Sequence, residues 1–173
     1  MADARVANTE SSLYDRDFFQ WTQAQAEALR SAGAGGNARL DYENLAEEIE
    51  SLGKRDRREL GSRIATIIEH LLKLEFSPAE QPRDGWRATV NRERKEVELI
   101  LRDSPSLRHG LEETLRQAAT RAGPGAVDEL TRKGENKAAA AVGRLVPWDR
   151  YTLEQVMDYW WPEHQGSGAP LAD

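Results

Sequence analysis

The sequence predicts an all-α protein: a single-domain bundle of five or six helices, with an antiparallel helical hairpin over about residues 41–75 at its centre. Three observations support this prediction. Apolar residues recur every three or four positions through most of the chain, as one face of a helix requires. No run alternates apolar and polar residues for long enough to form a sheet. The 173 residues, 39% hydrophobic and 31% charged, suit one domain with a modest core.

The predicted hairpin consists of two helical patterns that meet near Gly53. In the first pattern, Leu45, Ile49 and Leu52 follow the i, i+4, i+7 spacing of a helix face, and Gly53 suits a left-handed C-terminal cap. The second pattern has a wider apolar stripe, so we expect it to be the most buried helix. That stripe consists of Leu60, Ile64, Ile67, Ile68, Leu71 and Leu72.

The segment before the hairpin predicts a helix from Tyr14 to Ala32, which Asp15 or Asp17 can cap by accepting hydrogen bonds from its first N–H groups. Residues 1–12 are small and polar, and we expect them to be disordered. The apolar face of the predicted helix carries Phe18, Trp21, Gln25, Ala28 and Leu29.

After the hairpin, two prolines predict a loop over residues 77–84, and a third long helix is expected over residues 85–102. Ser104 and Pro105 break the chain and start another helix, since proline fits the first helical turn. We expect that helix to end near Ala122, because the motif Gly123-Pro124-Gly125 follows it.

The C-terminal third is less regular. Residues 126–144 are rich in alanine and predict a helix that Gly134 interrupts. Thr152 and Gln155 have the spacing of a capping box at the start of a last short helix, which Pro162 ends. Residues 163–173 are expected to form a flexible tail.

Composition narrows the classes of function. A formal net charge of −6 argues against a generic nucleic-acid binder. The chain has no cysteine, which excludes disulfides, thiolate metal sites and cysteine nucleophiles, and fits a reducing compartment. The N-terminus lacks a signal-peptide pattern, and no apolar run approaches the ~18 residues of a membrane span. We therefore expect a cytoplasmic protein without membrane contact.

Five pieces of the sequence carry a family resemblance, and they cover roughly residues 13–120 in order. They are LYDRDFFQW at 13–21, LDYENLAEEIESLG at 40–53, HLLKLEFSP at 70–78, GWRATVNRERKEV at 85–97 and DSPSLRHGL at 103–111. Together they resemble the bacterial domain-of-unknown-function family twenty-nine. The resemblance implies an all-helical fold over about residues 13–162 and supplies no assigned activity. Residues 123–145 depart from the pattern and are interpreted as an atypical insertion.

Motifs that would assign an enzymatic reaction are missing from the sequence. No serine has the flanking glycines of a nucleophile elbow, and there is neither a phosphate-binding loop nor a dinucleotide fingerprint. A di-metal bundle would need Glu-x-x-His motifs on facing helices, and the chain has none. We therefore expect no cofactor and no metal, and we favour a protein that is not an enzyme.

Two glutamates and one arginine are the candidates for a polar pocket or a buried ion pair. Glu48 lies beside the seam of Leu45 and Leu52, and Glu93 lies at the centre of the apolar stripe of its helix. A carboxylate that faces a core must be paired, or its pKa rises. Arg94 is the expected partner of one of them. The pair can form a pocket or simply fix the register of the helices.

Two surfaces are candidates for binding a partner. Lys54, Arg55, Arg57 and Arg58 form a basic face at the start of the second helical pattern. Near the C-terminus, Tyr159 and Trp161 point away from the inward side of the last helix, and an exposed aromatic patch favours protein contact.

The leading hypothesis is therefore a non-enzymatic helical interaction protein that can bind a protein partner or self-associate. Two alternatives stay open. A nucleic-acid-associated protein would use the basic face, although the net charge makes nucleic acid a poor partner. An enzyme would use a pocket that contains the two buried glutamates.

Overall fold

Residues 12–34, 41–145 and 149–165 are described by a computed structural model of the chain. They form seven α-helices and one 3-10 helix, and none of them forms a strand. Five of these helices have eight residues or more. The predicted all-α fold is confirmed. No helix in these three ranges has the length and the apolar character needed to cross a membrane.

Two helices open the described part of the chain, α1 (Leu13–Arg16) and α2 (Phe18–Gly33). Asp17 lies between them and caps α2, because its Oδ1 accepts a hydrogen bond of 2.8 Å from the backbone N–H of Gln20. The same carboxylate accepts hydrogen bonds from the backbone N–H and the hydroxyl of Ser106. Asp17 therefore fixes the start of α2 to a distant part of the chain.

The longest helix, α3 (Tyr42–Phe76), runs without a break through the region where the sequence predicted a hairpin. Its 35 residues rise about 52 Å along the axis. The second half is the centre of the core, since the predicted stripe from Leu60 to Leu72 is at most 1% exposed. The prediction of a turn near Gly53 was wrong.

Gly53 is needed for its small size. It is buried, and a Cβ there would lie 2.4 Å from Oγ1 of Thr22 and 3.1 Å from the ring of Phe19, both on α2. At the other end of the contact, a Cβ on Gly33 would lie 2.9 Å from Cβ of Tyr42. Thus α2 runs antiparallel to the first half of α3. The hairpin of this protein pairs those two segments.

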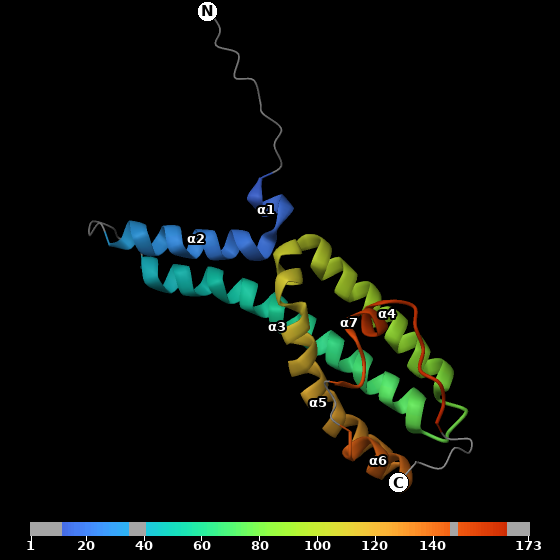
Figure 1. Ribbon diagram of the computed structural model, residues 1–173. Helices are drawn as coiled ribbons and strands as arrows, with labels where there is room; N and C mark the ends of the chain where they lie inside the picture. The colour runs from blue at the N-terminus through green and yellow to red at the C-terminus, as the bar shows by residue number, and fades with distance from the viewer. Residues whose placement is uncertain (1–11, 35–40, 146–148, 166–173) are drawn as a thin grey trace, which may run out of the picture.

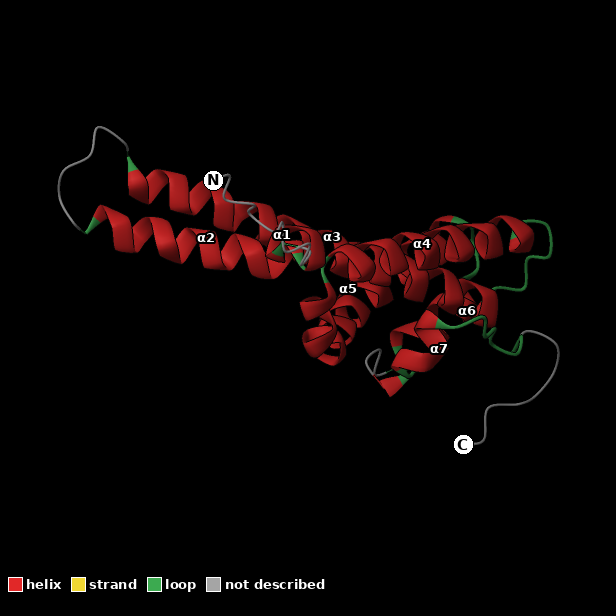
Figure 2. Cartoon of the chain, turned by 90° about the horizontal axis from the view of Figure 1, so that it is seen from above, coloured by secondary structure: helices red, strands yellow, loops and turns green. Residues whose placement is uncertain are grey.

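We call α2 together with residues 42–53 of α3 the arm. Figures 1 and 2 show the arm projecting away from the rest of the molecule, which we call the body. Residues 35–40, which join the two helices of the arm, lie outside the described residues. The arm is therefore only two helices thick, and much of its surface faces solvent.

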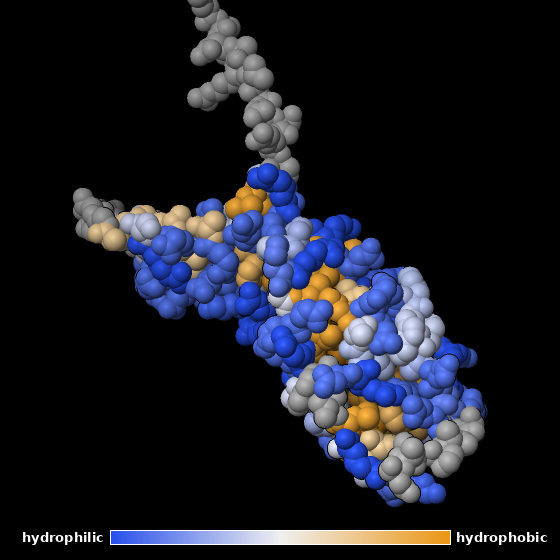
Figure 3. Space-filling view, in the orientation of Figure 1, coloured by the Kyte–Doolittle hydropathy of each residue, from blue (hydrophilic) through white to orange (hydrophobic). Residues whose placement is uncertain are grey.

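The body is built on the second half of α3. It contains α4 (Arg83–Asp103), the 3-10 helix η1 (Pro105–Gly110) and α5 (Leu111–Arg132), and both α4 and α5 pack against α3. Figure 3 shows apolar surface gathered where α4 and α5 flank α3, with polar surface around it. Aliphatic side chains and alanines from these helices fill the space between them.

The motif Gly123-Pro124-Gly125 does not end α5, which continues to Arg132, so this predicted stop was wrong. Pro124 is exposed, and water can therefore satisfy the carbonyl group that proline leaves without an N–H donor. A Cβ on Gly125 would lie only 2.9 Å from Oε2 of Glu69. The motif makes room for a carboxylate of α3.

The last helices follow the sequence prediction more closely. Gly134, whose φ is 77°, separates α5 from α6 (Asn136–Gly143). Helix α7 (Leu153–Met157) begins with the predicted capping box of Thr152 and Gln155, but it ends before Pro162.

The chain after α7 returns to the end of α3. The backbone N–H of Gln165 donates a hydrogen bond of 2.8 Å to the carbonyl of Glu75, and Nε2 of His164 donates to the carbonyl of Ser77. These residues open the tail that was expected over 163–173, and its remainder lies outside the described residues, as do residues 1–11.

Candidate functional site

The three residues predicted to form a polar pocket are not brought together. Glu48 is exposed on the arm, whereas Glu93 and Arg94 are buried in the body. The expected burial of Glu48 was wrong, because α2 covers the side of α3 that carries Ala46 and Gly53. That side lies one position away from the leucine seam that the sequence suggested.

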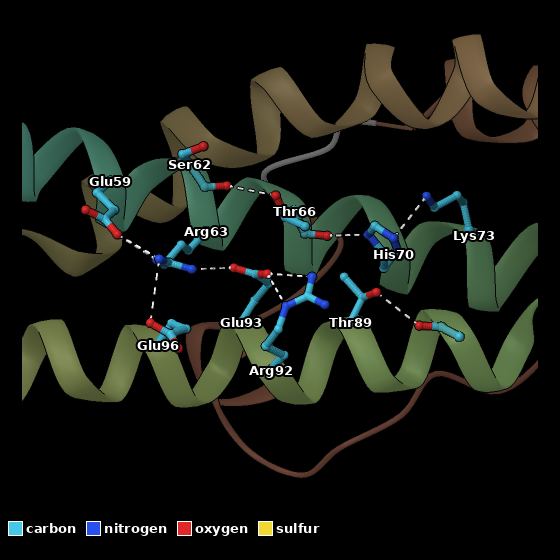
Figure 4. Close-up of polar contacts among 11 residues, drawn as sticks. Glu59, Ser62, Arg63, Thr66, His70, Lys73, Thr89, Arg92, Glu93 and Glu96 are labelled. Atoms are coloured by element: carbon cyan, nitrogen blue, oxygen red, sulfur yellow. Dashed lines mark hydrogen bonds and ion pairs between the residues drawn. The ribbon is translucent and has the colours of Figure 1, made fainter.

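Glu93 lies in an ion-pair network between α3 and α4 (Figure 4). Its Oε2 accepts a hydrogen bond of 2.9 Å from Arg63, and its Oε1 accepts two bonds of 3.0 and 3.1 Å from Arg92. Arg63 also reaches Glu59 at 2.7 Å and Glu96 at 3.6 Å. Both carboxylate oxygens of Glu93 therefore have cationic donors.

Arg94 donates hydrogen bonds to backbone carbonyl groups of the C-terminal segment, whereas the sequence predicted a carboxylate as its partner. Its Nε donates to the carbonyl of Val156 at 2.9 Å, and its Nη2 donates to the carbonyls of Gln155 and Trp160 at 2.9 and 3.0 Å. The remaining nitrogen, Nη1, is buried and has no hydrogen-bond partner among the described residues. The guanidinium also lies 5.1 Å from the ring centre of Trp161. Its burial lowers the pKa of Arg94 below the ordinary arginine value.

A buried lysine that sequence reasoning missed connects α3 with α5. Lys73 is 2% exposed, and its Nζ donates to Glu129 at 2.6 Å, to Glu69 at 3.1 Å and to Nε2 of His70 at 3.3 Å. Its three protons therefore have three acceptors. The ammonium also lies 5.8 Å from the ring centre of Trp86.

The contacts of this cluster determine its protonation. Nδ1 of His70 lies 2.9 Å from the carbonyl of Thr66, which can only accept, so the proton is on Nδ1 and Nε2 is free to accept from Lys73. Burial and the charge of Lys73 lower the pKa of His70. Partial burial would raise the pKa of Glu129, but hydrogen bonds from Lys133 and Lys73 outweigh it and hold that pKa at about 2.

A second buried carboxylate fixes the chain after α6. Glu75 is 2% exposed and accepts hydrogen bonds from the hydroxyl of Tyr151 at 2.6 Å, from Nε of Arg150 at 3.1 Å and from the side chain of Gln165 at 3.2 Å. Burial raises the pKa of Tyr151 above its ordinary value. Together with Trp160, these residues line a partly open pocket of about 290 Å³.

These clusters connect helices and segments that are far apart in the sequence. Glu75, Glu93 and Glu129 each accept from at least two donors, and at least one of these donors belongs to another segment of the chain. Within the described ranges, no three His, Cys, Asp or Glu residues gather closely enough to hold a metal ion.

The predicted basic face lies where the arm joins the body, and all four of its side chains are exposed. Lys54 pairs with Glu50 at 3.0 Å, and Arg57 lies over the ring of Phe19 at 4.9 Å. Among the residues that the structure describes, Arg55 and Arg58 form no ion pair within 4.0 Å.

The two predicted aromatic contact residues differ in exposure. Tyr159 is 77% exposed. Trp161 is partly buried, with the guanidinium groups of Arg94 and Arg87 lying 5.1 and 5.8 Å from its ring centre.

The arm carries a separate group of apolar side chains on its surface. Leu45 and Leu52 are 41% and 40% exposed, and each immediately precedes a buried residue of the α2–α3 contact. On α2, Phe18 and Trp21 likewise precede residues of that contact. Both are partly buried, and the ring of Tyr14 in α1 packs edge-on against them, with ring centres 5.7 and 4.9 Å away. In an antiparallel helix pair, positions one residue before the contact positions lie on the same side of the pair. We call Phe18, Trp21, Leu45 and Leu52 the apolar side of the arm.

The opposite side of the arm is charged. Arg30 of α2 donates to Glu50 at 2.7 Å and to Glu43 at 3.4 Å, and both acids belong to α3. Glu47, which follows the buried Ala46, is exposed on this side. The charged side of the arm thus resembles an ordinary solvated helix surface, whereas the apolar side exposes leucine side chains.

The comparisons with known proteins agree with the helical architecture. The family model described as Domain of unknown function DUF29 matches residues 13–161. The chain belongs to this family. The match includes residues 123–145, whose interpretation as an insertion stays a prediction. No curated protein matches the chain.

One solved structure is similar along nearly the whole chain. It is an alpha-helical protein of unknown function from Rhodospirillum rubrum, with 25% sequence identity and a TM-score of 0.61. The similarity covers 87% of this chain and 92% of that one. The neighbour therefore supports the all-helical fold, and neither the family nor the neighbour has an assigned activity.

Proposed function

We propose that this member of the family is a non-enzymatic interaction protein of the bacterial cytoplasm that binds a helical partner along the apolar side of its arm. The observation that carries the proposal is the exposure of Leu45 and Leu52 on the side that also holds Phe18 and Trp21. Apolar side chains gathered on one side of a projecting element are typical of contact surfaces.

The geometry of the apolar side favours a helix as the partner. Leu45 and Leu52 are seven residues apart, which is about two helical turns. Side chains at this spacing form the ridges that pack into the grooves of another helix. Covering the exposed part of each leucine contributes up to about 1 kcal/mol, and the aromatic rings beside them add further area.

The body supports a binding role over an enzymatic one. The buried acids Glu75 and Glu93, and the half-buried Glu129, all accept hydrogen bonds from basic side chains. A catalytic acid or base must be able to exchange a proton with a substrate. In addition, a chain without cysteine suits a reducing compartment.

Site-specific photo-crosslinking in bacterial cells that produce this protein tests the proposal. A photoreactive amino acid at Leu52 samples the apolar side, and one at Glu47 samples the charged side as a matched control. We expect one reproducible adduct from position 52, with the crosslinked residue on the apolar face of a helix, and none from position 47. No adduct at position 52, or equal adducts at both, would contradict the proposed surface.

A further inference from the structure

We infer that the partner that covers the apolar side of the arm is a second copy of this chain, packed antiparallel so that the two arms form a four-helix contact. This inference rests on the proposed function and deepens it by naming the partner. Its basis is the distribution of charge beside Leu52.

Two charged residues of opposite sign lie on either side of Leu52 along α3. Glu48 and Arg55 are exposed on α3, and neither forms an ion pair within 4.0 Å among the described residues. Glu48 precedes Ile49 and Arg55 precedes Asp56, and both Ile49 and Asp56 are half-buried residues of α3. Because a residue one position before a contact position lies on the apolar side of the arm, Glu48 and Arg55 lie at the edge of that side. They are two helical turns apart, and the point midway between them is next to Leu52.

This arrangement is self-complementary. A two-fold axis beside Leu52 places Leu52 of one copy against Leu52 of the other. The same axis places Glu48 of each copy against Arg55 of the other, so both charges gain a partner. A two-fold contact requires a surface that matches its own rotated image, and a charge pair placed evenly about an apolar centre does so.

The area is sufficient for a reversible dimer. A 16-residue helix such as α2 is about 24 Å long, and two helices side by side are about 20 Å wide. The apolar side therefore offers roughly 500 Å² per copy, or about 1,000 Å² in total, which is near the lower limit of specific interfaces. We expect a dissociation constant in the micromolar range.

Sedimentation velocity of the full-length protein, over concentrations up to about 300 µM, tests the inference. The wild type should dimerise. Glu48→Arg and Arg55→Glu each set like charges against one another and should weaken the dimer about tenfold. The double variant restores opposite charges and should recover most of the affinity. Because both residues are exposed, all variants should keep the helical content of the wild type by circular dichroism.

The outcomes separate this inference from the proposed function. Three results would overturn the second copy as partner. The wild type could stay monomeric, neither charge reversal could weaken the dimer, or the double variant could dimerise as weakly as the single variants. A crosslink from position 52 to the helix of another protein, or to residues 1–11 of the same chain, would also overturn it. The proposed function fails if position 52 gives no helical partner, or if positions 47 and 52 give equal adducts.

Discussion

The close approach of α2 and α3 at Gly53 gives a specific prediction about stability. In Gly53→Ala, the new Cβ would lie 2.4 Å from Oγ1 of Thr22, a fully buried and β-branched side chain that cannot rotate away easily. Overpacking of this kind costs about 1–3 kcal/mol. The higher helix propensity of alanine offsets up to about 1 kcal/mol. We therefore expect a net loss of up to about 2 kcal/mol.

Gly85→Ala is the matched control, because a Cβ there meets nothing within 4 Å. It should leave stability unchanged or raise it by up to about 1 kcal/mol. Urea denaturation monitored by circular dichroism measures the free energy of unfolding of both variants. The difference between them, about 1–3 kcal/mol, reports the steric conflict at Gly53.

Thr22→Ala distinguishes this packing from a turn. Removing the threonine hydroxyl should relieve the conflict, so Gly53→Ala should cost little or nothing in that background. A cap glycine in a turn would be destabilised by alanine whether or not Thr22 is present. An undiminished loss in the double variant, or a gain from Gly53→Ala alone, would refute the continuous helix packed against α2.

Three further predictions concern the buried polar contacts. Lys73→Met should lower the free energy of unfolding by about 1–3 kcal/mol, because the half-buried Glu69 and Glu129 each lose a charged hydrogen-bond donor, whereas Lys133→Met should cost less than about 1 kcal/mol in the same urea titration. The pKa of Glu129 is about 2, below its value in an unfolded chain, so its contribution is complete above about pH 4.5 and is lost as the pH falls towards 2. Glu129→Gln should flatten the fall in unfolding free energy across that range, and an unchanged profile would contradict the assigned pairing. Arg94→Met should expose the backbone of residues 155–160 to faster hydrogen exchange while leaving the arm protected, and equal protection in variant and wild type would contradict the role of Arg94.

The helices were predictable because local patterns encode them. The stripe from Leu60 to Leu72 identified the most buried segment, and the Thr152 and Gln155 spacing identified a helix start. The two wrong stops, near Gly53 and Gly123, share one cause. Glycine can end a helix or allow two elements to approach closely, and only the position of the neighbouring element decides between these roles.

The candidate sites were harder to predict for a similar reason. Periodicity shows which face of a helix is apolar, but the structure shows that α2 covers only part of that face in the arm. The sequence offered one weak signal for Lys73, a lone lysine within the apolar run HLLKLEF. Its partner Glu129 lies 56 positions further along the chain, a separation that no local pattern reports.

Pulsed electron spin resonance gives the most direct test of the central claim, that the apolar side of one arm packs against that of a second copy. The chain has no cysteine, so a single introduced cysteine carries the only spin label. Glu48→Cys places the label at the edge of the apolar side, one helical turn from Leu52, without removing a leucine, and Glu47→Cys places it on the charged side. We predict an intermolecular distance below about 25 Å for position 48 and one at least about 10 Å longer for position 47. The absence of an intermolecular distance at about 300 µM protein, or a shorter distance for position 47, would contradict the account.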